Sequence, residues 1–108
     1  MEKERIVAFD DLAFESLGDI KWCLSCGSEI EFIWKNKCYT ITHPDGKMCI
    51  GEAYYLKDGK AYNILSDTEY DTNQMVESED IDDILNYKLG QDRLRDNVTK
   101  IGVVYRSL

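Results

Sequence analysis

The sequence predicts an α+β fold in a single domain over residues 1–108: an antiparallel meander sheet of four to five strands with helices packed on one face. The hydrophobic period changes from helical to alternating at Glu29, and three turn signals follow at intervals of about a dozen residues. A chain of 108 residues is long enough to bury a core without disulfides or metal. The expected order of elements is α-β-β-β-β-α-α-β.

A helix is predicted over residues 16–26, after a packed lead-in at residues 9–15. Ser16 with Asp19 three positions later is a variant of the capping box. Apolar residues follow at helical spacing, and Gly27 supplies the stop.

Strand alternation begins next, with Ile30, Phe32 and Trp34 on one face. A turn at residues 36–37 would place Trp34 opposite Tyr39 and Phe32 opposite Ile41. Asp-Gly pairs at 45–46 and 58–59 predict two further hairpins. The cross-strand pairs expected from these turns are Ile41 with Ile50 and Tyr55 with Tyr62.

The C-terminal half is expected to be more helical. Residues 66–77 show no period and are predicted to form a loop. Ser78 is expected to cap a helix that ends at Gly90, with Ile81, Ile84 and Leu85 inward. A second short helix is predicted over residues 92–98, and a last strand over residues 102–106.

The net charge of −8 arises in one segment, because no Lys or Arg occurs between Lys60 and Lys88. A field of one sign favours a partner of the opposite sign, so a basic protein surface is expected rather than nucleic acid or an anionic membrane. The candidate partner-binding residues are the eight acids of this gap: Asp67, Glu69, Asp71, Glu77, Glu79, Asp80, Asp82 and Asp83.

Tyrosine is abundant in the chain and suits interfaces, because it joins an apolar body to a polar tip. Tyr55 and Tyr62 are the tyrosines expected to contact a partner. Gly51 and Ala53 share their face, which predicts a thin surface that is either open or covered by a partner.

The motif Cys23-Leu-Ser-Cys26-Gly27 resembles half of a zinc knuckle. The further ligands would have to be Cys38, His43 or Cys49. The expected register places Cys38 and Cys49 about 13 Å apart along the strands, with His43 on the other face. Structural thiols without metal are therefore predicted, and a thioredoxin-type redox pair is a further alternative.

Two other patterns do not meet the requirements of a metal site or a catalytic site. Residues 67–73 alternate oxygen ligands as a calcium loop does, but Thr72 replaces the glycine and Ser78 the bidentate glutamate. His43 is the single histidine, and Asp45 is its one obvious partner. The prediction is therefore a protein that is not an enzyme, with no catalytic residues and no cofactor.

The chain has no apolar run of the roughly 20 residues that span a bilayer, and its N-terminus lacks the apolar region of a signal peptide. A cytoplasmic protein is expected.

Parts of the sequence resemble small uncharacterised proteins of low-GC Gram-positive bacteria, their phages and other mobile elements. The resemblance covers residues 22–42, with Gly27-Ser-Glu-Ile-Glu-Phe32 and Lys37-Cys-Tyr-Thr-Ile-Thr42, and the tail at residues 84–88 and 94–96. It implies an accessory protein of a mobile element and transfers no site.

Together these observations predict a non-catalytic, acidic protein-binding domain. A phage or mobile-element inhibitor of a basic nucleic-acid-binding host protein, acting as a nucleic-acid mimic as anti-CRISPR proteins do, is one concrete form. Two alternatives stay open: a small metal-binding module using Cys23 and Cys26, and a homo-oligomeric accessory protein. The chain is expected to be a monomer or a homodimer.

Overall fold

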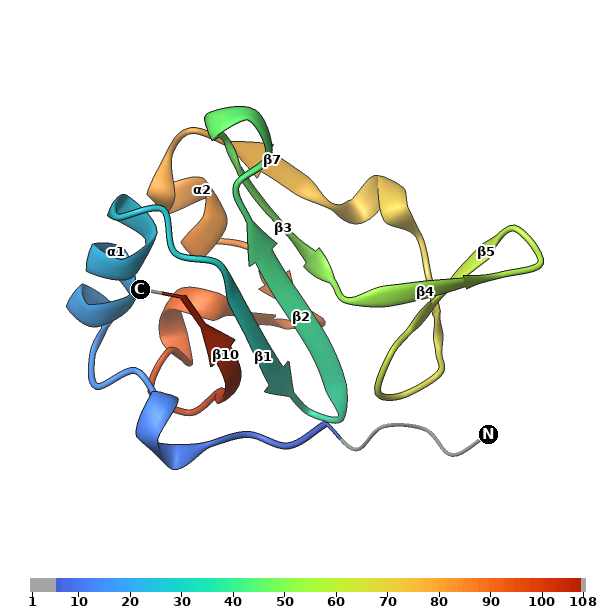
Figure 1. The fold of residues 1–108 in the computed structure, drawn as a ribbon, viewed down its shortest axis with the longest axis horizontal. Helices are drawn as coiled ribbons and strands as arrows, with labels where there is room; N and C mark the ends of the chain where they lie inside the picture. Colours follow the sequence, from blue (N-terminus) through green and yellow to red (C-terminus); the bar gives the residue numbers. More distant parts are fainter. Residues whose placement is uncertain (1–5, 108) are drawn as a thin grey trace.

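A computed structural model describes residues 6–107 and confirms the α+β class, with two α-helices and a five-stranded antiparallel sheet (Figure 1). Residues 1–5, which belong to the N-terminal segment where no signal peptide is predicted, lie outside the described residues. No helix within residues 6–107 is long and apolar enough to cross a membrane. The strands of the main sheet lie in the order β10 (Gly102–Arg106), β1 (Ile30–Trp34), β2 (Lys37–Thr42), β3 (Met48–Glu52) and β7 (Val76–Ser78).

Helix α1 (Leu17–Ser25) follows a 3-10 turn at Asp10–Leu12 and has the predicted caps. The Ser16 hydroxyl accepts a hydrogen bond from the backbone N–H of Asp19 at 3.1 Å. At the other end Gly27 has φ +80°, and the N–H groups of Gly27 and Ser28 bond back to Leu24 and Cys23. These two hydrogen bonds form the Schellman motif, which explains why the helix ends here.

The register of the first hairpin differs from the prediction by two residues. The turn lies at Lys35 and Asn36, which both have positive φ, so Phe32 opposes Tyr39 and Ile30 opposes Ile41. A two-residue turn of type I′ needs left-handed backbone at both positions, and Asn tolerates it. Because the shift is even, every side chain keeps its predicted face. The Ile41–Ile50 and Tyr55–Tyr62 pairs are confirmed.

The predicted meander does not continue as one sheet. Strands β4 (Tyr54–Lys57), β5 (Lys60–Asn63) and β6 (Glu69–Tyr70) form a separate three-stranded sheet, which projects from the main body in Figure 1. The chain leaves the main sheet at Ala53, whose carbonyl accepts from Ile64 and whose N–H donates to Cys38.

Three predictions for the C-terminal half are wrong. Residues 66–77 contain strand β6, a 3-10 turn at Thr72–Gln74 and the start of edge strand β7. Helix α2 (Ile81–Leu85) is capped by Asp80 rather than Ser78 and is short, because β8 (Lys88–Leu89) pairs with β9 (Asp92–Arg93). Residues 94–96 form a 3-10 turn instead of an α-helix, and the last strand is confirmed as β10.

The core lies between the helices and one face of the main sheet, as predicted. Phe32, Ile41 and Ile50 are fully buried on that face and pack with residues of α1 and α2. Within residues 6–107 no α-helix packs on the opposite face of the main sheet, and that face carries the site described next.

Candidate functional site

Five of the eight predicted partner-binding acids have local partners. Each stabilises a turn, a cap or a strand pair, which is the role expected of acids on an ordinary solvated surface. The contacts are Asp67 with the Tyr55 hydroxyl (2.8 Å), Glu69 with Lys60 (4.0 Å), Asp71 with the Asn73 N–H (2.9 Å), Asp80 with the Asp82 N–H (2.9 Å) and Asp83 with the Ser78 hydroxyl (2.7 Å).

The other three acids form an exposed group that we call the acidic corner: Glu77, Glu79 and Asp82. They lie on β7, on the bend after it and on the first turn of α2, and within residues 6–107 their carboxylates have no hydrogen-bond or ion-pair partner. Glu79 precedes the helix, so it does not share a helical face with Asp82 and Asp83 as the capping prediction implied.

Tyr55 and Tyr62 stack on the outer sheet, with ring centroids 5.7 Å apart. The hydrogen bond to Asp67 raises the pKa of Tyr55. The face of Gly51 was predicted to be open or covered by a partner, and it is instead covered by residues of the same chain. Gly51 is buried, and a Cβ there would lie 2.7 Å from both Met75 and the Tyr70 hydroxyl.

The Cys23–Cys26 pair closes α1 and does not meet further metal ligands. Cys23 is buried, Cys26 is exposed, and a guanidinium nitrogen of Arg106 lies 3.7 Å from the Cys23 sulfur. Burial raises the pKa of Cys23. Within residues 6–107 no group of three or more His, Cys, Asp or Glu side chains is placed to hold a metal ion, and this covers the calcium-like residues 67–73.

His43 is half-buried before the Asp45–Gly46 turn. Both ring nitrogens are buried without a hydrogen-bond partner among the described residues, so Asp45 does not orient the ring.

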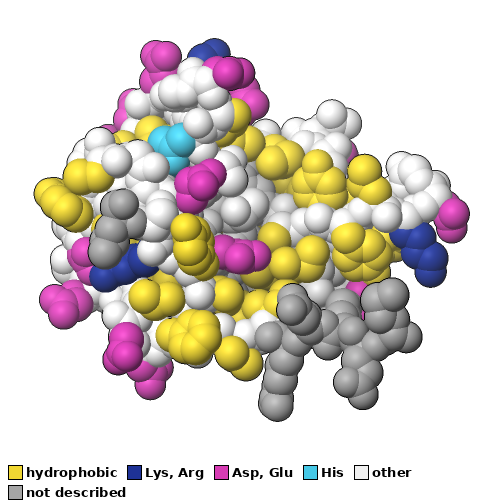
Figure 2. Space-filling model, in the orientation of Figure 1, with side chains coloured by type: hydrophobic (Ala, Val, Ile, Leu, Met, Phe, Trp, Pro, Cys, Tyr) yellow, Lys and Arg dark blue, Asp and Glu magenta, His cyan; other side chains and the backbone are white. Residues whose placement is uncertain are grey.

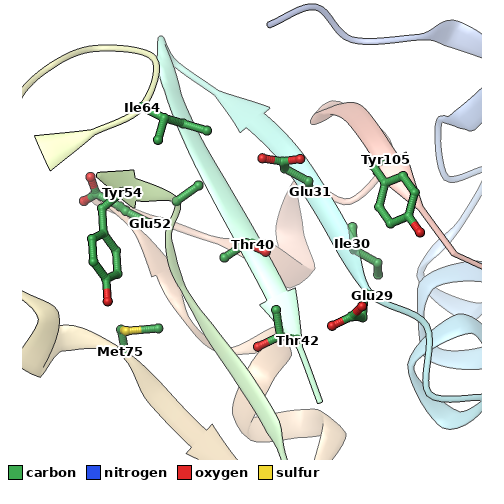
Figure 3. Close-up of a pocket in the computed structure, with 11 residues that line it drawn as sticks. Glu29, Ile30, Glu31, Thr40, Thr42, Glu52, Tyr54, Ile64, Met75 and Tyr105 are labelled. Carbon is green, nitrogen blue, oxygen red and sulfur yellow. The ribbon is translucent and has the colours of Figure 1, made fainter. Parts of the chain in front are cut away.

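The uncovered sheet face carries a groove of about 420 Å³ that the sequence analysis did not find (Figure 3). Thr40 and Thr42 of β2 lie on its floor. Glu29, Glu31 and Tyr105 lie on one side, and Tyr54, Ile64 and Met75 lie on the other. The alternation of β1 and β2 explains the floor, since residues that face away from Phe32 and Ile41 must point into it.

The cross-strand register arranges the groove residues in rows that run across the strands. Glu31 opposes Thr40 on one side and Tyr105 on the other, and Thr40 opposes Gly51. Because Gly51 has no side chain, Met75 closes over it and forms the wall. Of the other wall residues, Tyr54 comes from β4, Ile64 follows β5 and Tyr105 comes from β10. These segments are far apart in the sequence, so periodicity alone gives no signal for this assembly.

Asn63 joins the two sheets behind this wall. Its side chain is fully buried, accepts from the Cys38 N–H at 3.1 Å and donates to the Cys38 carbonyl at 3.0 Å and to Oε1 of Glu52 at 2.9 Å. The amide thus imitates a strand partner at the point where β4 leaves the main sheet, and it fixes the position of Tyr54.

The groove is acidic. Among residues 6–107 no Lys, Arg or His lines it, whereas Glu29 is exposed and Glu31 is half-buried. The Cys38 thiol donates to Oε1 of Glu31 at 3.7 Å. Burial and the nearby Glu31 charge raise the pKa of Cys38 to about 12, so the thiol keeps its proton and helps hold the carboxylate.

One residue of the acidic corner lies on the same sheet face as the groove. Glu77 opposes Cys49, and Cys49 opposes Thr42 of the groove floor. Figure 2 shows hydrophobic side chains across the middle of one side of the molecule, with Asp and Glu between and around them and few Lys or Arg.

The fold and this face define a small acidic α+β domain with an aromatic-walled, carboxylate-bearing groove. The chain matches no protein-family model, and no curated protein or solved structure is significantly similar to it.

Proposed function

We propose that the chain is a non-catalytic binding domain for a basic protein surface. The observation that carries the proposal is the acidic corner: Glu77, Glu79 and Asp82 are exposed and lie in a segment of the chain without Lys or Arg. Opposite charge across an interface speeds encounter and suppresses wrong partners.

The partner class is a nucleic-acid-binding protein of the host cytoplasm. Its binding surface is basic because it receives phosphates, and dispersed carboxylates on a rigid sheet edge can occupy such a surface. The resemblance to proteins of phages and mobile elements makes an inhibitor of a host defence nuclease, acting in the manner of an anti-CRISPR protein, the form to test.

The test compares three immobilised baits in a nuclease-treated bacterial lysate. The first is the parent chain, and the second is a corner variant with Glu77→Lys, Glu79→Lys and Asp82→Lys. The third is a matched control with Asp10→Lys, Asp11→Lys and Glu15→Lys, which are also exposed. Three reversals bring the net charge from −8 to −2 in both variants.

We expect one basic host protein to be retained by the parent and the control and to be lost by the corner variant. Retention should also weaken between 0.1 and 1 M salt, where the Debye length falls from about 10 Å to about 3 Å. Equal retention by all three baits, with no dependence on salt, would falsify the proposal. Thermal melting of each variant verifies that the reversals leave the fold intact.

A further inference from the structure

We infer that the groove on the uncovered sheet face binds an arginine side chain presented by an extended segment of the partner. The inference rests on the proposed function and adds the site of specific recognition, which differs from the acidic corner that attracts the partner.

The shape and walls of the groove fit a flat cation. Its volume of about 420 Å³ falls in the range of ligand pockets, which is large enough for one long side chain with adjoining backbone. Tyr54 and Tyr105 are 38% and 51% exposed on its two sides. A guanidinium stacks on tyrosine faces and is less strongly hydrated than an ammonium group.

The carboxylates supply the counter-charge. Glu31 is held from one side by the Cys38 thiol at Oε1, which leaves Oε2 for a donor in the groove. Glu29 lies nearby on the same side, and its side chain is exposed. The hydroxyls of Thr40 and Thr42 on the floor provide further acceptors. A planar guanidinium has five donors and matches such a set better than a lysine ammonium does.

The negative charge of the groove also disfavours other occupants. A second copy of this chain carries the same net charge of −8 and would bring like charge to an acidic groove. Nucleic acid and anionic lipid are excluded for the same reason. A basic segment of a different protein remains as the occupant.

The inference is tested with two blocked peptides, tri-arginine and tri-lysine, titrated into the full chain and followed by calorimetry and by amide NMR shifts. We expect tri-arginine to bind at least about fivefold more tightly than tri-lysine, because the guanidinium adds stacking and paired hydrogen bonds. The largest shifts should fall on Glu31, Thr40 and Tyr105.

Two groove variants and two matched controls complete the test. Glu31→Gln should weaken tri-arginine binding about tenfold, since a charge-assisted hydrogen bond is lost. Tyr105→Leu keeps the strand and the apolar surface but removes the ring, so the arginine preference should fall about threefold or more. The controls Glu69→Gln and Tyr62→Leu change the same residue types outside the groove and should leave both affinities within twofold.

The corner variant separates this inference from the proposed function. It should weaken both peptides equally and keep the preference for arginine, because it alters only long-range attraction. Equal affinity of the parent for the two peptides, or unchanged binding by both groove variants, overturns the groove inference. In that case a host protein retained through the acidic corner still supports the proposed function.

Discussion

Both the oxygen and the nitrogen of the Asn63 side-chain amide have hydrogen-bond partners inside the protein. Besides the two bonds to Cys38 and the bond to Glu52, its Oδ1 accepts from the N–H groups of Leu65 and Ser66 at 3.0 and 3.3 Å. A buried polar group with this many partners is costly to remove, because each partner then loses a bond in a place that water does not reach.

Replacing Asn63 with Ala should therefore destabilise the protein by about 3–5 kcal/mol, as measured by urea unfolding. Asn63→Asp should also destabilise it, because a carboxylate would then face Glu52. That variant should recover stability relative to its parent as the pH is lowered, since protonation removes the repulsion. Asn73→Ala, at an exposed position, is the control and should stay within about 0.5 kcal/mol. An Asn63→Ala variant as stable as this control would show that the junction does not hold the two sheets.

The sequence alone does not reveal that Asn63 connects the two sheets. Asn63 ends a short strand, and its partners Cys38 and Glu52 belong to other strands. Ser16 and Gly27 were predicted correctly for the opposite reason, because cap and stop act on backbone a few residues away.

At the scale of elements, tight turns organise the sheets. The backbone is left-handed at Lys35 and Asn36 in the first hairpin, at Asp45 and Gly46 in the second and at Asp58 and Gly59 in the third. The two Asp-Gly turns were found from the sequence because Gly marks them. The first was misplaced by one residue because it has no Gly.

Substitutions at Asn36 measure the conformational strain at the first hairpin turn. Asn36→Gly should raise the free energy of unfolding by a few tenths to about 1 kcal/mol, because Gly adopts positive φ without steric cost. Asn36→Ala should lower it by about 1 kcal/mol. Lys35 is kept in both variants, since it pairs with Asp92 at 2.8 Å. If both variants melt at the temperature of the parent, the turn does not lie at these two residues.

The elements that the sequence did not predict are those held by tertiary contacts. Strand β7 has three residues and exists because β3 offers it an edge. Helix α2 ends early because Lys88 and Leu89 pair with β9. Alternation placed Phe32 on the core face of β1, but the groove on the opposite face was not predicted, because its walls require β4 and β10 to be placed in space.

At the scale of the whole molecule, the interior contains thiols and phenols that folding keeps neutral. Burial raises the pKa of Cys38 and of Tyr39 to about 12, and it also raises the pKa values of Tyr70 and Tyr87. In the unfolded chain the same groups ionise near 8.5 for Cys and 10 for Tyr, as a rough guide.

Stability should therefore fall at alkaline pH. A group whose pKa is raised by folding contributes stability that is complete below its unfolded pKa and is lost as the pH rises through the folded one. Between about pH 9 and 12 the unfolded chain releases protons that the folded chain keeps, so the free energy of unfolding should drop by about 1.4 kcal/mol per pH unit for each proton. Urea unfolding at pH 8, 9, 10 and 11 measures this slope.

Cys38→Ala provides the matching control, because it should reduce the first part of the decline, where the thiols ionise before the tyrosines. Burial also raises the pKa values of Cys23 and Cys49, which supply the rest of that part. A free energy of unfolding that stays constant from pH 8 to 11 would contradict the neutral interior.

The pairing of β10 with β1 has a consequence for synthesis of the chain. Ile30 finds its partner Arg106 only after the intervening residues have been made, which takes about 4–15 seconds at 5–20 residues per second. During that interval the hydrophobic strand β1 has one unpaired edge while its hairpin with β2 is already able to form. Glu29 and Glu31, which line the groove once the protein has folded, then give the nascent edge a charge that opposes pairing with another chain.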